Sequence, residues 1–371
     1  MKDIVKLGTL GDIFIGLTYR PEDVANEGTI VLRSSNIQNG KLDFTDIVRV
    51  KCKVRENLIV KPNDILMCSR NGSAKLDGKC TLLPKMDEEM SFGAFMTIIR
   101  TQHNPYLVHF FNSNAFRGQL GSAATTTINQ ITRRMLDDIS VPLYPKEQED
   151  YIVSLFNQID ELIWTETQKL ELFDELVKSR FIELFGDPNT NPMKWNKEQL
   201  QINATLLNGR AYKQDELLDN GKYPVLRVGN FFSNRGWYYS DLELDEDKYC
   251  DDGDLLYAWS ASFGPRIWNG GKVIYHYHIW KVLVGEKYDK QFLCHLLDYA
   301  TASFMGDTHG IGMMHLTKSG MEETEFIVPP IDLQNQFTAF VEQTDKSKLA
   351  VQQSLEKLEA LKKSLMQQYF G

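Results

Sequence analysis

The chain has 371 residues, 42% of them hydrophobic and 11% aromatic, and its formal net charge at pH 7 is −9. The hydrophobic share excludes a disordered chain, and the length exceeds what one core usually serves, so we expect two or more domains. The five cysteines are widely spaced and form no C-x-x-C pair, which argues against a disulfide framework or a zinc ribbon and fits a reducing compartment.

The first ten residues, MKDIVKLGTL, contain no apolar signal-peptide core, and no apolar stretch approaches the ~18 residues of a membrane span. We therefore expect a cytoplasmic, soluble protein without a membrane partner. The negative charge argues against a nonspecific nucleic-acid binder. It is unevenly distributed: residues 1–143 carry +3, residues 144–186 and 187–330 carry −6 each, and residues 331–371 are neutral.

Residues 1–143 have the pattern of a mixed β and α block. Short runs rich in β-branched residues, such as GTIVLRS, DIVRVKCKV and FMTIIR, are bounded by Gly, Asn, Pro and Asp, which predicts strands. The stretch PYLVHFFNSNAFRGQL has a helical pattern. This mixture indicates an α+β fold rather than a doubly wound sheet.

Residues 144–186 have the pattern of one long helix. After Pro145 the segment contains no Pro or Gly until Gly186, and the sequence GDPNTNP then ends it. The final Phe-Gly is typical of a glycine C-cap. Its apolar residues recur every three or four positions, a narrow seam typical of coiled-coil packing: Ile152, Phe156, Ile159, Ile163, Leu170, Phe173, Val177 and Leu184.

Residues 187–330 repeat the mixed pattern, with strand-like GKVIYHYHIWKVLVG and EFIVPP and helix-like QFLCHLLDYATASF, and residues 331–371 repeat the long helix. Two helices of ~40 residues, each ~60 Å long, can bury their seams against each other. A pseudo-twofold relation would make them antiparallel, as a rigid spacer between the two blocks. A generic helical linker is the alternative. The second seam consists of Val351, Leu355, Leu358, Leu365 and Tyr369.

The two halves are copies of one unit. The helix ends align residue for residue, and further upstream IVLRSSNI (30–37) matches PVLRVGNF (224–231) and KPNDILMCSRNGS (61–73) matches DDGDLLYAWSASF (251–263). NQIT (129–132) matches MHLT (314–317), and ISVP (139–142) matches FIVP (326–329). Chance similarity of two helical tails does not explain this common order, so we infer a duplication.

No catalytic motif stands out. GPRIWNGGKV has the wrong spacing for a phosphate-binding Walker loop, and NPY at 104–106 lacks the second Pro of an adenine methyltransferase motif. Glu246 and Lys248, with Asp241 upstream, loosely match a nuclease triad but belong to a charge-rich run typical of a solvated loop. His276 and His278 have no partner at metal-ligand spacing. These absences favour a binding protein.

The order of the segments resembles the specificity subunit of bacterial type I restriction–modification systems over the whole chain. FIELFGDP and PPIDLQNQF are characteristic of that family. The sequence departs from the family pattern in PLYPKEQ, where a Pro-Pro pair often precedes Glu-Gln, and in WNKEQLQIN, which lacks the Leu-Gly-Asp found at Leu10, Gly11 and Asp12.

The resemblance implies two target-recognition domains, 1–143 and 187–330, that each read half of a split sequence in double-stranded DNA, separated by the helices 144–186 and 331–371. It also implies that the helices fix the gap between half-sites and dock two methyltransferase subunits, and that two restriction subunits complete the complex. The chain itself is then noncatalytic and holds no cofactor. S-adenosylmethionine, ATP and Mg²⁺ are expected on the partner subunits.

Reading bases requires polar or cationic side chains on exposed loops. The candidate loops are SRNGSAK (69–75) and TTTINQITRR (125–134) in the first block, and WSASFGPR (259–266) and DTHGIGMMHLTK (307–318) in the second. The candidate DNA-contacting residues are Ser69, Arg70, Asn71, Lys75, Thr126, Asn129, Gln130, Arg133, Trp259, Ser260, Arg266, His309 and Lys318.

The aligned pairs Arg33/Arg227 and Asn36/Asn230 are further candidates, with scaffold and DNA-contacting roles equally open, because Asn also caps turns. Two other functions compete with a specificity subunit. One is an enzyme with its own nuclease or methyltransferase activity, against which the missing motifs count. The other is a stand-alone coiled-coil DNA-binding or scaffold protein without a methyltransferase partner.

Overall fold

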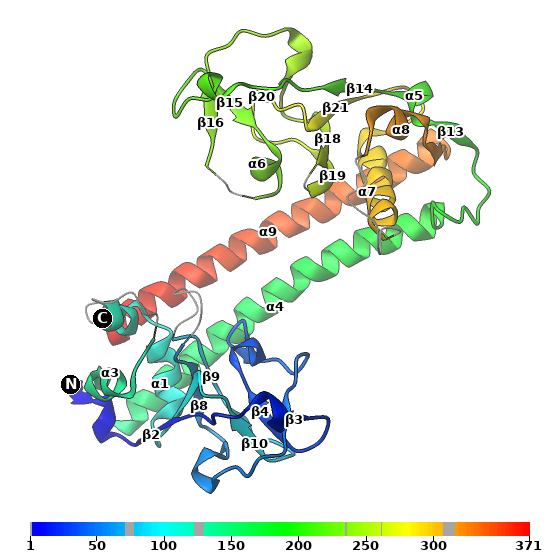
Figure 1. Ribbon diagram of the computed structural model, residues 1–371. Coiled ribbons are helices and arrows are strands. Elements are labelled where there is room, and N and C mark those ends of the chain that lie inside the picture. Colours follow the sequence, from blue (N-terminus) through cyan, green and yellow to red (C-terminus); the bar gives the residue numbers. More distant parts are fainter. Residues whose placement is uncertain (1, 71–77, 122–129, 234–235, 261, 307–315) are drawn as a thin grey trace. The chain divides into compact units, whose positions relative to one another are not determined.

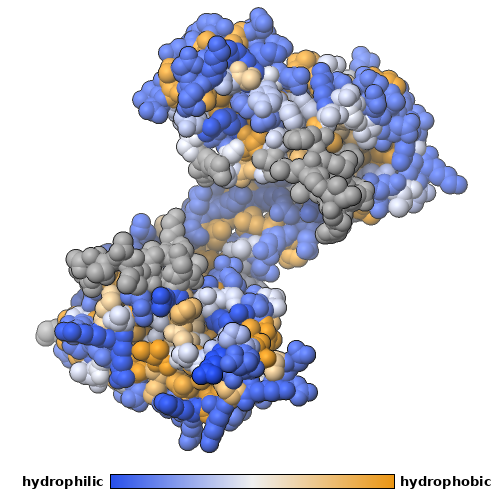
Figure 2. Space-filling model, in the orientation of Figure 1, coloured by the Kyte–Doolittle hydropathy of each residue, from blue (hydrophilic) through white to orange (hydrophobic). Residues whose placement is uncertain are grey.

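A computed structural model describes residues 2–70, 78–121, 130–233, 236–260, 262–306 and 316–371 (Figure 1). The chain divides into two compact units. Unit 1 consists of Met1–Gln168 with Val351–Gly371, and unit 2 consists of Lys169–Ala350. In Figure 2, hydrophilic residues cover most of the visible surface of each unit, and apolar residues show between them.

Unit 1 combines small sheets with short helices, as predicted. A four-stranded antiparallel sheet has the order β2-β11-β8-β9, and a second has the order β10-β4-β7-β3 with β10 and β4 parallel. Strands β1 and β12 pair, as do β5 and β6. The strands are β1 Asp3–Lys6, β2 Asp12–Ile15, β3 Val24–Ala25, β4 Thr29–Leu32, β5 Ile37–Gln38, β6 Lys41–Leu42, β7 Arg49–Val50, β8 Ile65–Cys68, β9 Cys80–Leu82, β10 Met90–Phe92, β11 Met96–Arg100 and β12 Ser140–Leu143. The helices are α1 Asn104–Phe111, α2 Asn114–Gly121 and α3 Arg133–Asp138.

Unit 2 repeats most of this arrangement, but the fourth strand of its second sheet, β17, pairs with β20, whereas β3 pairs with β7 in unit 1. Its sheets have the orders β14-β21-β18-β19 and β16-β15-β20-β17, and β13 pairs with β22. The strands are β13 Lys197–Gln199, β14 Ala204–Asn208, β15 Tyr223–Leu226, β16 Tyr238–Ser240, β17 Tyr249–Cys250, β18 Leu255–Ser260, β19 Ser262–Ile267, β20 Val273–Tyr275, β21 Ile279–Val284 and β22 Glu325–Ile327. The helices are α5 Leu200–Asn203, α6 Val228–Phe232, α7 Lys290–Gly306 and α8 Lys318–Glu323.

The two long helices are confirmed as α4 (Lys146–Phe185) and α9 (Ile331–Phe370). Each contributes one half to unit 1 and the other to unit 2. The predicted glycine C-cap of α4 is also present, because Gly186 has a φ of 72° and its N–H bonds the Ile182 carbonyl at 2.8 Å.

The helices run antiparallel. In unit 1 Asp160 pairs with Lys362, and in unit 2 Asp174 pairs with Lys348. Moving 14 residues forward on α4 and 14 back on α9 leads from one ion pair to the other, so both units hold the helices in one register. Such exposed pairs add little stability, and the apolar contacts beside them carry the packing.

The core of each unit includes the end of a helix. In unit 1 the Phe370 ring lies 5.4 Å from Tyr106 of α1 and 5.8 Å from Phe156 of α4, measured between ring centroids. In unit 2 the Phe185 ring lies 4.6 Å from Phe292 of α7 and 5.7 Å from Phe337 of α9. Each sheet-bearing block is therefore anchored on both long helices.

The internal repeat is confirmed by equivalent local bonds. Asp64 and Asp254 each accept the backbone N–H three residues earlier, from Lys61 and Asp251, at 2.8 Å. Thr132 and Thr317 cap α3 and α8 with their hydroxyl oxygens.

One sequence match is out of register. Leu7 N–H bonds the Ile139 carbonyl at 2.9 Å, and Leu200 N–H bonds the Thr324 carbonyl at 3.0 Å. Ile139 is therefore equivalent to Thr324, two residues before the position that matching ISVP with FIVP predicts. The sequence match was wrong because it aligned the Val-Pro pair that both segments contain. Strand register follows the backbone hydrogen bonds between strands and not the position of a proline.

Phe370→Ala should destabilise unit 1 by about 3–5 kcal/mol, because it leaves a cavity among buried aromatic rings. Denaturant unfolding monitored by circular dichroism measures the change. The control is Leu361→Ala on the same helix, since Leu361 is 48% exposed and such a surface change costs about 0.5 kcal/mol or less. Equal losses for both variants would contradict the described packing of α9.

Candidate functional site

The ends of β8 and β11 form an exposed edge in unit 1. Ser69 is buried there: its hydroxyl donates to the Phe95 carbonyl at 3.1 Å and accepts from the Thr97 hydroxyl at 2.9 Å. The next residue, Arg70, is exposed, and its guanidinium lies 5.3 Å from the centroid of the Phe95 ring. Ser69 thus braces the strand end that presents Arg70.

Two of the predicted loops meet at this edge. Arg70 forms a β-bridge with Gln130, and the Ile131 N–H bonds the Ser69 carbonyl at 2.8 Å. The described ends of SRNGSAK and TTTINQITRR therefore lie side by side, although they are 60 residues apart in sequence. The predicted contacts Asn71, Lys75, Thr126 and Asn129 lie outside the described residues.

Arg70 and Phe95 together present a cation and an aromatic face. Phe95 is 59% exposed, so its ring is open to a planar partner. A guanidinium donates up to five hydrogen bonds in a fixed plane and fits guanine edges or phosphate oxygens. Arg133, the first residue of α3, is also exposed and is 3.8 Å from Asp137, a contact too long and too exposed to immobilise it.

Unit 2 presents a different set of side chains on the same scaffold. The Trp259 N–H bonds the His278 carbonyl at 3.0 Å, as the Ser69 N–H bonds the Phe95 carbonyl at 2.9 Å. The Trp259 ring stacks on Trp280 with centroids 5.7 Å apart, and its indole N–H donates to the Tyr277 carbonyl at 2.9 Å. Ser260 ends β18 at the position of Arg70.

Burial lowers the pKa of His276 to about 4 and also lowers the pKa of His278. Both rings are therefore neutral near pH 7 and belong to an aromatic edge with Trp259 and Tyr277. Among the residues that the structure describes, no group of three His, Cys, Asp or Glu side chains is arranged to hold a metal ion.

The other described residues of unit 2 that were predicted to contact DNA already make contacts within the protein. Arg266 donates to the Phe231 carbonyl at 2.6 Å and lies over the rings of Phe231 and Phe232. Lys318 begins α8 as Arg133 begins α3, and it is 3.5 Å from Glu322. His309 lies outside the described residues.

The aligned Arg and Asn pairs support the scaffold role that the sequence left open. Asn36 is buried; its amide donates to the carbonyls of Asp43 at 2.8 Å and Asp46 at 2.9 Å and accepts from the Arg33 N–H. Arg33 also pairs with Asp46 at 2.6 Å. In unit 2 the Asn230 amide donates to the Gly236 carbonyl at 3.2 Å, and Arg227 lies over the Tyr238 ring at 4.2 Å.

One repeated segment beside the edge was not predicted from the sequence. GLTYR (16–20) and GRAYK (209–213) occupy equivalent places, with bridges from Leu17 to Gly93 and from Arg210 to His276. A Cβ on either glycine would approach a carbonyl oxygen within 2.4 Å, so only glycine fits. The shared G-x-x-Y followed by a cation was the available signal. No repeated sequence pattern pointed to Phe95.

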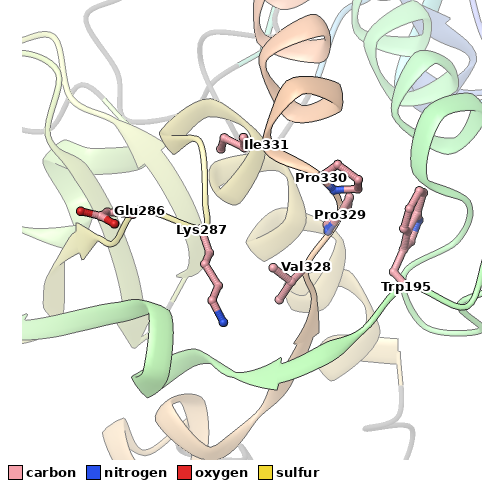
Figure 3. A pocket seen from close by; sticks show the side chains of 7 residues that line it. All are labelled: Trp195, Glu286, Lys287, Val328, Pro329, Pro330 and Ile331. Carbon is pink, nitrogen blue, oxygen red and sulfur yellow. The ribbon is translucent and has the colours of Figure 1, made fainter.

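A shallow apolar recess lies elsewhere in unit 2, beside the start of α9 (Figure 3). Its one lysine, Lys287, is already paired with Glu198 at 2.7 Å, so the recess does not suggest a reaction. It is lined by Trp195, Glu286, Lys287, Val328, Pro329, Pro330 and Ile331. None of the described helices is long and apolar enough to cross a membrane.

Comparisons with known proteins agree on one family. The type I restriction modification DNA specificity domain matches residues 192–361. The EcoKI specificity subunit of Escherichia coli K12 is 27% identical over 69% of this chain, and the StySPI specificity subunit of Salmonella potsdam is 24% identical over 98%. The alignments cover 60% of the first relative's length and 87% of the second's.

Two solved structures share the fold. One chain, from a study of complex assembly and conformational transition of the type I R-M system, aligns with a TM-score of 0.62. The other, the S subunit of a type I restriction–modification system from M. genitalium, aligns with a TM-score of 0.58. Each is 15% identical; the alignments cover all of this chain and 97% and 96% of those chains, respectively.

Lowering the pH should destabilise unit 2. Because the pKa of His276 is about 4 in the folded chain and ~6.5 in an unfolded one, the unfolded state takes up a proton first as the pH falls from 6.5 to 4. His276→Gln should reduce this loss, by less than the limiting value of about 1.4 kcal/mol per pH unit, because His276 is only half-buried and solvent screens part of the effect; urea unfolding between pH 4 and 8 measures it. An unchanged slope would show that the surroundings of His276 do not lower its pKa as described.

Proposed function

We propose that this chain, which belongs to the family of type I restriction–modification specificity subunits, reads a split sequence in double-stranded DNA, one half with each unit. The observation that carries the proposal is the repeated edge. Equivalent strand ends, braced by equivalent bonds, present Arg70, Phe95 and Gln130 in unit 1 and Trp259, Ser260 and His278 in unit 2.

The two edges carry different side chains, which supports the recognition of a different DNA half-site by each unit. A base edge is read by hydrogen bonds and apolar contacts, whereas phosphate contacts carry no sequence information. Arg70 suits guanine O6 and N7, and Gln130 suits adenine. The aromatic edge of unit 2 offers stacking and apolar contact, for example with a thymine methyl group. One scaffold with two edges thus suits an asymmetric, bipartite target.

The long helices suit a spacer, because α4 and α9 each have one half in unit 1 and the other in unit 2. In this proposal they set the gap between half-sites and dock two methyltransferase subunits, which methylate adenine with S-adenosylmethionine. Two restriction subunits with ATP and Mg²⁺ would complete the cytoplasmic complex. The chain itself would supply recognition and no catalysis.

Arg70→Ala should relax recognition in one half-site only and weaken it by about 1–3 kcal/mol, because a bidentate base contact acts locally. The measurement is methylation of a library of DNA targets by the assembled complex. The control is Arg117→Ala, which removes an exposed arginine of α2. Loss of both half-sites, or an unchanged motif and rate, would contradict the role of Arg70.

Seven residues inserted in each helix should lengthen the gap and keep both half-sites. The insertion points lie midway between the two ion pairs, at 167/168 in α4 and at 354/355 in α9. A heptad preserves the seam and adds about 10 Å, or about three base pairs. Sequencing of methylated sites measures the gap. A changed half-site sequence, or an unchanged gap in an active complex, would contradict the spacer role.

A further inference from the structure

Equivalent surface segments of the two units carry opposite charge. In unit 1 Thr29 of β4 lies opposite Val50 of β7, and in unit 2 Tyr223 of β15 lies opposite Ser240 of β16. Because β4 and β15 are equivalent strands, Val50 is equivalent to Ser240. The residues that follow are then Lys51 and Asp241, Lys53 and Glu243, and Arg55 and Asp245.

The backbone after these strands confirms the equivalence. Arg55 and Asp245 are both extended, with φ near −73° and −63°, and each precedes a 3-10 turn, Glu56–Leu58 and Glu246–Lys248. Exposed and half-buried residues alternate identically along 51–55 and 241–245. The charged side chains therefore occupy the same outward positions in both units, and only their sign differs.

The cations of unit 1 have no counter-ion among the described residues. Neither Lys51, Lys53 nor Arg55 forms an ion pair in that part of the chain, whereas Glu243 pairs with Lys222 and Asp241 accepts the Lys222 N–H at 2.8 Å. In unit 1 the residue equivalent to Lys222 is Gly28, which has a φ of 118°. A Cβ at Gly28 would lie 2.2 Å from the Val50 carbonyl oxygen. No side chain fits there to neutralise the cations.

We infer that Lys51, Lys53 and Arg55, the cationic strip, bind the phosphates of one DNA strand, so that unit 1 supplies sequence-independent affinity that unit 2 lacks. The inference rests on the proposed DNA-reading function. The three cations are exposed at alternate positions of one short surface segment, and successive phosphates of a DNA strand likewise form a row of like charges, so the row of cations can lie along a phosphate backbone. The acidic counterpart in unit 2 offers no such contact, and the two segments account for 6 of the 9 charges by which the blocks, at +3 and −6, differ.

The test uses the complex assembled with its methyltransferase subunits. Binding to DNA with and without the recognised sequence is measured over a range of salt concentrations. The variant Lys51→Gln, Lys53→Gln, Arg55→Gln should reduce the slope of log affinity against log salt by about 2–3, since each phosphate contact contributes about 0.9. It should weaken both DNAs to the same extent and leave the methylated motif and gap unchanged.

Two further variants separate charge from folding. Lys51→Arg, Lys53→Arg, Arg55→Lys keeps the charges and should keep the wild-type slope. Lys51→Asp, Lys53→Glu, Arg55→Asp installs the residues that unit 2 carries on the same backbone, and it should weaken binding more than the Gln variant does.

If the wild-type complex binds DNA and the Gln variant shows the same slope of log affinity against log salt, the phosphate-binding role of the cationic strip is wrong, while the proposed function stands. Loss of the methyltransferase subunits from the variant, with an unchanged slope for the complexes that remain, would assign the strip to an acidic protein surface and also overturn the inference. If the wild-type complex shows no preference for any DNA sequence, the proposed function fails together with it.

Discussion

The packing of aromatic helix ends into the two sheet-bearing blocks is the contact on which the rest of the structure depends. Phe370 and Phe156 enter the core of unit 1, and Phe185 and Phe337 enter the core of unit 2. Neither block closes its core without both long helices, because α4 and α9 each supply one half to each unit. Because each helix belongs to two cores, a shift of one helix along the other would affect both units.

This constraint separates a fixed part of the chain from a variable part. The capped turns at Asp64 and Asp254 and the capped helices at Thr132 and Thr317 recur because they hold the sheets on the helices. The strand ends beyond them are free to differ, and they do: one edge is cationic and polar, the other aromatic. The charge-inverted segments after β7 and β16 show the same freedom.

Much of the fold was predictable from the sequence, because seams, caps and glycine stops are local signals. The long helices, the C-cap at Gly186 and the order of the repeats follow from them. The site was less predictable. Ser69 is buried by bonds to residues 26 and 28 positions away, and the Asn36 amide is held by carbonyls 7 and 10 positions away. The sequence pattern identifies polar residues in loops. It does not tell which of these residues are already hydrogen-bonded to partners far away in the sequence.

The most direct test of DNA recognition is a genome-wide map of N6-methyladenine in an unmodified host that expresses a partner methyltransferase with or without this chain. Our account predicts a split motif that appears only when the chain is present, with two unlike half-sites and a constant gap. Methylation that ignores the chain, or a stable and active methyltransferase that gains no motif from it, would contradict the account and favour a stand-alone binding protein.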